Sequence, residues 1–244
     1  TRGHGQSVKS DDDLGFFYDD EGSHCVEDVH HMISMIKQKV NVPVILFGHS
    51  MGSLIVRAYT KKYDDEIDAL VVCGSPSKNP MASIALKLVG FISVFKGDHH
   101  RSKFIHNMAF SSFGKRFNED FSENNWLSAN KENVHAYDKD AYSGFIFTLN
   151  GFKNLFHLMK VVYDEKGWGI KNANLPILFV AGKDDPCIDT VEKFKEAYTF
   201  LQQRGYKDVS SHLFEGMRHE ILNETQRKEV FDYIVEWLDG CIGS

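Results

Sequence analysis

The chain has 244 residues, a net charge of −6 and a pI of about 6.0, a balance that gives no reason to expect nucleic-acid binding. Hydrophobic residues make up 42% of it and aromatic residues 13%, enough for one large α/β domain or for a domain with an insertion. The four cysteines are scattered and form no C-x-x-C pair, which favours reduced thiols in the cytoplasm over a disulfide framework or a metal site.

The first elements in chain order are a turn, a helix and a strand. Residues 2–5 (RGHG) are typical of a tight turn that leaves the carboxyl end of a strand. Between about 24 and 39, apolar residues recur at helical spacing and predict an amphipathic helix. The apolar run 42–47 is rich in branched residues, which predicts a strand buried on both faces of a parallel sheet.

Residues 48–52 (GHSMG) match the pattern G-x-S-x-G and are followed by an amphipathic run. Strand, tight turn and helix in that order is the context of a nucleophile elbow, so we predict an elbow rather than an ordinary loop. The turn should strain the backbone of Ser50 and require small neighbours, here Gly48 and Gly52. At the helix N-terminus, the amide of Met51 could then donate to an oxyanion.

Three further strands are predicted at 69–73, 177–181 and 210–214. Helices are predicted at 190–203 and 225–238. Alternating strands and helices indicate a mostly parallel sheet that is covered by helices on both faces.

Residues 77–174 interrupt this alternation with aromatic-rich, largely helical sequence. We expect a helical cap inserted into a core of residues 1–76 and 175–244. Within the cap, 81–95 is nearly all apolar, with Lys87 its only charge, and is too short to span a bilayer. A buried cap helix is the favoured interpretation. The alternative is a lid that lines an acyl pocket or transiently contacts a lipid surface.

A serine hydroxyl needs a neighbouring imidazole as base, and a carboxylate that orients the imidazole. In this architecture the partners follow in the order serine, acid, histidine, each after a strand. His219 follows the last predicted strand and is the predicted base. Asp184 and Asp185 both follow the strand before it. We choose Asp185, because related loops place the acid three residues after the glycine that ends the strand.

No metal site is predicted. Cys187 lies two residues beyond Asp185 and borders the predicted site, but a small packed core residue is the favoured interpretation. Asp98 and the histidines at 99, 100 and 106 are more typical of a solvated loop, because nothing else in the sequence supplies ligands.

Together, residues 2–5, 48–52, 182–185 and 215–219 resemble the α/β-hydrolase superfamily. They resemble most closely its monoacylglycerol lipase and lysophospholipase group, also described as serine aminopeptidase S33-like. The resemblance spans nearly the whole chain outside the cap. It implies an α/β-hydrolase fold, hydrolysis of a small-molecule carboxylic ester with an acyl chain, a cap over the site, and neither a metal nor an organic cofactor.

The sequence departs from this family before the RGHG turn. The family has several earlier strands there, and a histidine-glycine loop on one of them gives the second oxyanion amide. We expect this part in the natural protein or in a companion polypeptide, because a central apolar strand left as an open edge exposes unpaired amides. Alone, the chain should fold poorly and be nearly inactive, since losing one oxyanion donor costs on the order of 10²–10³ in rate.

Two alternatives to an esterase remain. A peptidase or amidase of the iminopeptidase type would cleave an amide, but such enzymes usually bind the substrate amine with acidic cap residues, and aromatic content favours an acyl group. A non-catalytic binding protein on the same fold is the second. The presence of Ser50, Asp185 and His219 together argues against it.

Overall fold

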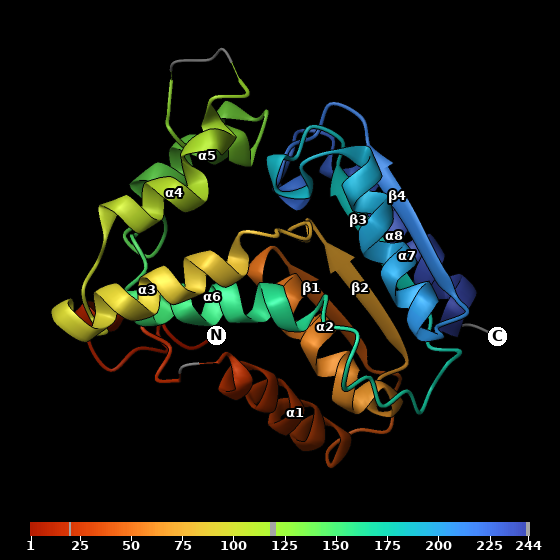
Figure 1. The fold of residues 1–244 in the computed structure, drawn as a ribbon. Helices are drawn as coiled ribbons and strands as arrows, with labels where there is room; N and C mark the ends of the chain where they lie inside the picture. Colours follow the sequence, from red (N-terminus) through yellow and green to blue (C-terminus); the bar gives the residue numbers. More distant parts are fainter. Residues whose placement is uncertain (20, 118–120, 243–244) are drawn as a thin grey trace.

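The structure, a computed structural model, describes residues 1–19, 21–117 and 121–242. At its centre lies a parallel sheet of four strands in the order β1-β2-β3-β4 (Figure 1). The strands are β1 (Ile45–His49), β2 (Ala69–Cys73), β3 (Ile177–Gly182) and β4 (Val209–Phe214). Because the strands are parallel, their carboxyl ends meet at one edge of the sheet, where ligands bind in open α/β folds.

The described residues also form eight α-helices. These are α1 (Ser23–Lys37), α2 (Met51–Tyr63), α3 (Ala82–Lys96), α4 (Lys103–Gly114), α5 (Lys131–Lys139), α6 (Leu149–Val161), α7 (Val191–Arg204) and α8 (Arg227–Ile242). The predicted strand 69–73 coincides with β2, and the other core elements beyond it start within two residues of their predicted positions. The core order of strands and helices therefore follows from the sequence.

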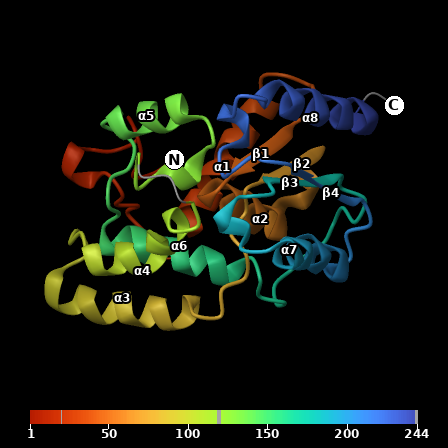
Figure 2. The same ribbon diagram turned by 90° about the horizontal axis from the view of Figure 1, so that it is seen from above.

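Helices cover both faces of the sheet, as predicted. On β2, Leu70 and Val72 point into a large apolar core that they share with α2 and α7. The alternate residues Val71 and Cys73 point into a smaller core against α8. Figure 2 shows α8 on one side of the strands and α2 with α7 on the other. This alternation is the two-residue period of a strand between two helical layers.

β1 differs from its prediction. The observed strand begins at Ile45, three residues later than the predicted run 42–47, and it is not buried on both faces. Ile45 is 39% exposed and Phe47 is 38% exposed. The reason is that β1 pairs with β2 alone among the described strands, so its other edge is open. The prediction of burial on both faces is wrong.

The four helices α3 to α6 follow β2 and precede β3 in the chain. In the fold, α3 lies beside α6 (Figure 1). α3 buries Ala82, Ala85 and Val89, but Phe91 and Val94 are 65% and 80% exposed. The favoured expectation of a buried helix is therefore wrong for its outer face. In the part of the chain that the structure describes, no helix has both the length and the apolar character to cross a bilayer.

Candidate active site

Ser50 occupies the turn between β1 and α2 with φ 54° and ψ −122°. A non-glycine residue at positive φ stores backbone strain of about 1–3 kcal/mol and needs its surroundings to hold it there. Two bonds do so: the Ser50 amide donates to the Cys73 carbonyl at 3.0 Å, and the Ser50 carbonyl accepts from the Ser53 amide at 2.9 Å. The turn has the strained geometry that the G-x-S-x-G pattern predicts.

The two glycines of the turn are not equivalent. A Cβ on Gly48 would lie 2.5 Å from the Gly52 carbonyl oxygen and 2.6 Å from a methyl of Val56, so β1 can approach α2 this closely only without a side chain. A Cβ on Gly52 would meet no atom within 4 Å. The expectation that both positions must be small is therefore wrong at Gly52, whose Cα faces open space.

The amide of Met51 is the first of α2. Within the described residues no acceptor takes it, as expected for the first N–H groups of a helix. Met51 and Ser50 both line the main cavity. The amide can therefore donate to a negatively charged oxygen beside Ser50.

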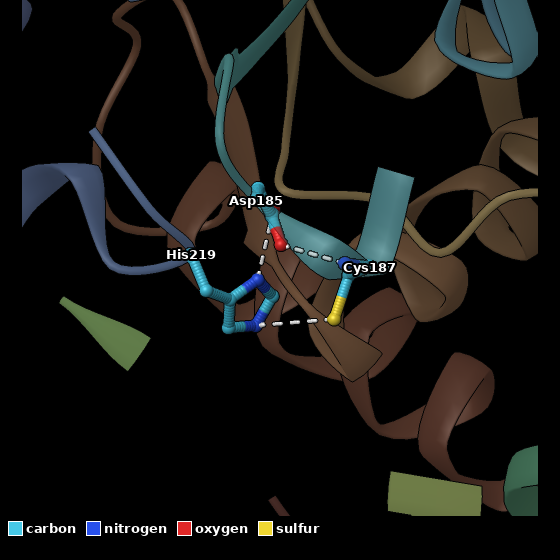
Figure 3. A group of neighbouring side chains, drawn as sticks. All are labelled: Asp185, Cys187 and His219. Carbon is cyan, nitrogen blue, oxygen red and sulfur yellow. Dashed lines mark hydrogen bonds and ion pairs between the residues drawn. The ribbon is translucent and has the colours of Figure 1, made fainter. Parts of the chain in front are cut away.

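His219 and Asp185 form a buried pair, 2% and 1% exposed (Figure 3). Their atoms Nδ1 and Oδ2 are 2.9 Å apart, and Oδ1 accepts from the amide of Cys187 at 2.8 Å. Because a carboxylate only accepts, Nδ1 carries a proton, and in the neutral imidazole Nε2 then presents its lone pair. Asp184 is exposed. The structure thus brings Asp185 to the imidazole, and not its neighbour.

The pair also sets the charge of the imidazole. Burial lowers the pKa of His219, but the charge of Asp185 and the hydrogen bond to Asp185 outweigh burial and hold the pKa well above 6.5. Burial, and next the charge of His219, lower the pKa of nearby His49 to about 4. His49 is therefore neutral at pH 7, and its Nε2–H donates to the His219 carbonyl at 3.0 Å. Uncharged His49 thus holds the backbone of His219 through a hydrogen bond.

Cys187 is partly exposed, and its Sγ lies 4.0 Å from Nε2 of His219. It borders the site and is not the packed core residue that we expected. Burial raises the pKa of its thiol, which keeps it protonated. Ligand atoms of Asp185, Cys187 and His219 lie within 4.8 Å of one another, a spacing that could hold a metal ion. A metal on Nε2 would take the lone pair that a serine needs as its base.

Ser50 and His219 line one cavity of about 1740 Å³, which also has lining residues from α3, α4 and α6. Within the described residues no hydrogen bond joins Ser50 Oγ to His219, so the structure places them in one cavity without a direct bond. Catalytic bonds often tighten only with substrate. Apolar side chains of α3, α4 and α6 form part of the cavity wall, among them Ile84, Leu88, Met108, Phe110, Leu155 and Phe156.

Gly74 also shapes the site and was given no role from the sequence. It follows β2 at φ +55°, and a Cβ there would lie 3.2 Å from Cε1 of His219 and 3.3 Å from Oδ2 of Asp185. A glycine directly after a buried strand was the available signal. The spacing of residues in the sequence could not show that the absence of a side chain at Gly74 leaves room for His219 and Asp185.

We expect Gly74→Ala to lower kcat about 10- to 100-fold, because the added methyl displaces the imidazole and the left-handed backbone disfavours a side chain. Ester hydrolysis by the complete natural protein measures this. Gly90→Ala is the matched control, since a Cβ at Gly90 in α3 meets no atom within 4 Å. Equal rates for the two variants would show that Gly74 does not set the place of His219.

The sequence profile of the family described as "Serine aminopeptidase, S33" matches residues 1–226. The chain belongs to this family. With its parallel sheet and its elbow, this member of the S33 serine aminopeptidase family is an α/β-hydrolase of the group that includes monoacylglycerol lipases.

Solved structures agree with this assignment. A thermostable carboxyl esterase from Bacillus coagulans is 25% identical with a TM-score of 0.89, over 99% of this chain and 79% of the esterase. A monoglyceride lipase from Saccharomyces cerevisiae is 20% identical with a TM-score of 0.71, over 98% of this chain and 75% of the lipase. A monoacylglycerol lipase from Paleococcus ferrophilus is 20% identical with a TM-score of 0.63, over 89% of this chain and 75% of the lipase. The two lipases are similar to this chain in fold.

Proposed function

We propose that this chain hydrolyses carboxylic esters of acyl chains, such as monoacylglycerols or lysophospholipids, with Ser50, His219 and Asp185 as a catalytic triad. The enzyme is a carboxylic ester hydrolase, in keeping with its family and its esterase and lipase neighbours. One observation carries the proposal. The buried pair of Asp185 and His219 orients an imidazole that lines the same cavity as a strained serine.

The proposed reaction has two halves. Ser50 attacks the ester carbonyl while Nε2 of His219 takes the hydroxyl proton, and the Met51 amide donates to the oxyanion. The imidazolium then gives this proton to the leaving alcohol, and the acyl-enzyme remains. In the second half, His219 takes a proton from water, which attacks the acyl carbon. The acid leaves when His219 returns the proton to Ser50. Asp185 holds Nδ1 and stabilises the charged imidazole throughout.

The cavity supports an acyl substrate. Its volume of about 1740 Å³ exceeds the roughly 300–1000 Å³ of sites for drug-sized ligands, which leaves room for a chain. The side chains of α3 and α4 give it an apolar wall, and the hydroxyl and imidazole lie at its sheet end. We propose that residues 77–174 act as a cap over a core of residues 1–76 and 175–244, and that the acyl chain lies between cap and core.

A series of p-nitrophenyl esters tests the substrate class. We expect kcat/KM of the complete natural protein to rise from acetate to medium and long acyl chains, because each buried CH₂ contributes about 0.8 kcal/mol. A maximum at acetate, or at aromatic acyl groups, would contradict the acyl-chain proposal and favour a general or phenolic-acid esterase.

The family description favours one alternative, an aminopeptidase. Turnover of an aminoacyl anilide compared with that of a monoacylglycerol separates the two readings, since a peptidase prefers the anilide. A binding protein on this fold would turn over neither and would leave Ser50 unlabelled by a fluorophosphonate.

We further propose that the open edge of β1 pairs with a strand of the natural protein or of a companion chain. Exposed Ile45 and Phe47 support this, as does exposed Val42 just before the strand. An open apolar edge otherwise exposes unpaired amides. Such a segment could also supply the second oxyanion amide. The experiments here therefore use the complete natural protein.

The outer face of α3 also supports transient contact of the cap with a lipid surface, because Phe91, Val94 and Phe95 are exposed there and Lys87 and Lys96 are its only charges. The cytoplasm remains the proposed compartment. All four cysteines of the chain are free, which fits a reducing environment.

A further inference from the structure

Beside the proposed catalytic pair, a turn of the cap is bonded to the loop that carries His219. We call residues 125–130 the cap turn and residues 215–224 the histidine loop. Glu224, the last residue of the histidine loop, is only 2% exposed. Glu224 is not among the described residues that line the cavity. A buried carboxylate away from the cavity must have partners other than substrate.

Those partners are backbone amides of both segments. Oε1 of Glu224 accepts from the amide of Arg218 at 3.0 Å and from that of Ala129 at 2.9 Å. Oε2 accepts from the amide of Asn130 at 3.1 Å. Hydrogen bonds to a charged acceptor are stronger than neutral ones. One carboxylate thus joins the cap turn to the residue that precedes His219.

The two residues that flank His219 also bond to the cap turn directly. Nη1 of Arg218 donates to the Asn125 carbonyl at 2.6 Å, and the amide of Glu220 donates to the Leu127 carbonyl at 2.7 Å. His219 is therefore held from both sides along the chain. A shift of the cap turn would move both of its neighbours.

The cap turn also contacts the imidazole itself. The ring of Trp126 lies 5.1 Å from that of His219, with the planes tilted by 40°. We infer that Glu224 is a positioning residue: by fixing the cap turn to the histidine loop, it lets the cap set the place of the His219 imidazole relative to Ser50. This inference rests on the proposed hydrolytic function of the same site.

Glu224→Gln in the complete natural protein tests the inference. An amide keeps one acceptor oxygen, so at least one backbone N–H of the joint loses its partner. We expect kcat to fall about 10- to 100-fold while KM for a short ester stays near the wild-type value. The rate of Ser50 labelling by a fluorophosphonate should fall by the same factor. Glu229→Gln, an exposed position in α8, makes the same charge change and should keep both rates.

The pH profile separates positioning from stability. The titratable groups against the imidazole are Asp185, Cys187 and His49, and Glu224→Gln alters none of them. A shift of the acid limb of kcat/KM thus reports a displaced imidazole. A lower melting temperature with wild-type kcat and an unshifted limb would overturn the inference, because Glu224 would then serve the fold alone.

A second variant decides the matter if Glu224→Gln does not fold. Asn133→Ala removes one bond between the cap and the histidine loop, from Nδ2 to Oε2 of Glu220 at 2.6 Å. We expect kcat to fall less than in Glu224→Gln, and the acid limb of kcat/KM to shift in the same direction. A pH profile equal to that of the wild-type enzyme would overturn the inference. Failure of the proposed function looks different, because the wild-type enzyme itself would then not be labelled at Ser50.

Discussion

Ser50→Ala in the complete natural protein is expected to lower kcat for acyl esters by about four to six orders of magnitude. The reason is that alanine removes the atom that attacks, while the free amide of Met51 and the cavity remain. Residual turnover should therefore reflect binding and oxyanion stabilisation alone. Hydrolysis of a short p-nitrophenyl ester, followed at several enzyme concentrations, measures the loss.

The control for this variant is Ser34→Ala in α1, which should keep the wild-type rate because Ser34 is not among the described residues that line the cavity. Circular dichroism and the melting temperature show whether each variant is folded. A folded Ser50→Ala enzyme that hydrolyses the ester at the parental rate would remove the proposed mechanism.

Asp185→Asn is expected to lower kcat by about 10⁴-fold with little change in the fold. The amide that replaces the carboxylate can donate a hydrogen bond to Nδ1. This stabilises the tautomer that carries its proton on Nε2, and Nε2 can then no longer accept the proton of Ser50. Asp184→Asn is the matched control, because Asp184 is the exposed neighbour in the same loop. Its rate should stay near the wild-type rate. The reverse result would make Asp184 the acid.

The pH dependence of kcat/KM gives this comparison a second readout. The base must be neutral, so the wild-type rate should climb as pH rises through the raised pKa of His219. Asp185→Asn removes the charge that raises this pKa and leaves the burial that lowers it. The limb should therefore move to lower pH in the variant. A limb that stays in place would show that Asp185 does not set the charge of His219.

Much of the core could be predicted from the sequence, because its patterns are local. The strand 69–73 is entirely apolar and buried, and its predicted bounds are the observed ones. The strained turn at Ser50 follows from a five-residue pattern with a strand before it and a helix after it. Asp185 and His219 could be predicted because each lies in the loop that follows a strand, and parallel strands end at the same edge.

The errors concern features that depend on contacts far apart in the chain. The run 42–47 predicts a strand that is buried on both faces of the sheet. The burial of Ile45 and Phe47, however, depends on a neighbouring strand at the open edge of β1. The apolar residues of α3 could not show which face meets α6 and which stays exposed. The glycine after β2 was visible in the sequence, but its contact with the imidazole was not. Nothing in the sequence shows that Glu224 bonds residues 125–130 to the loop that carries His219, because these segments meet only in the fold.

The proposed mechanism depends on the reactivity of a single hydroxyl, that of Ser50. The measurement is peptide mapping by mass spectrometry of the complete natural protein after brief reaction with a fluorophosphonate, with His219→Ala treated in parallel. The expected spectrum shows one adduct, on the peptide that contains Ser50, and none on the variant. Active wild-type protein with its adduct on another residue, or equal labelling of the variant, would contradict the account.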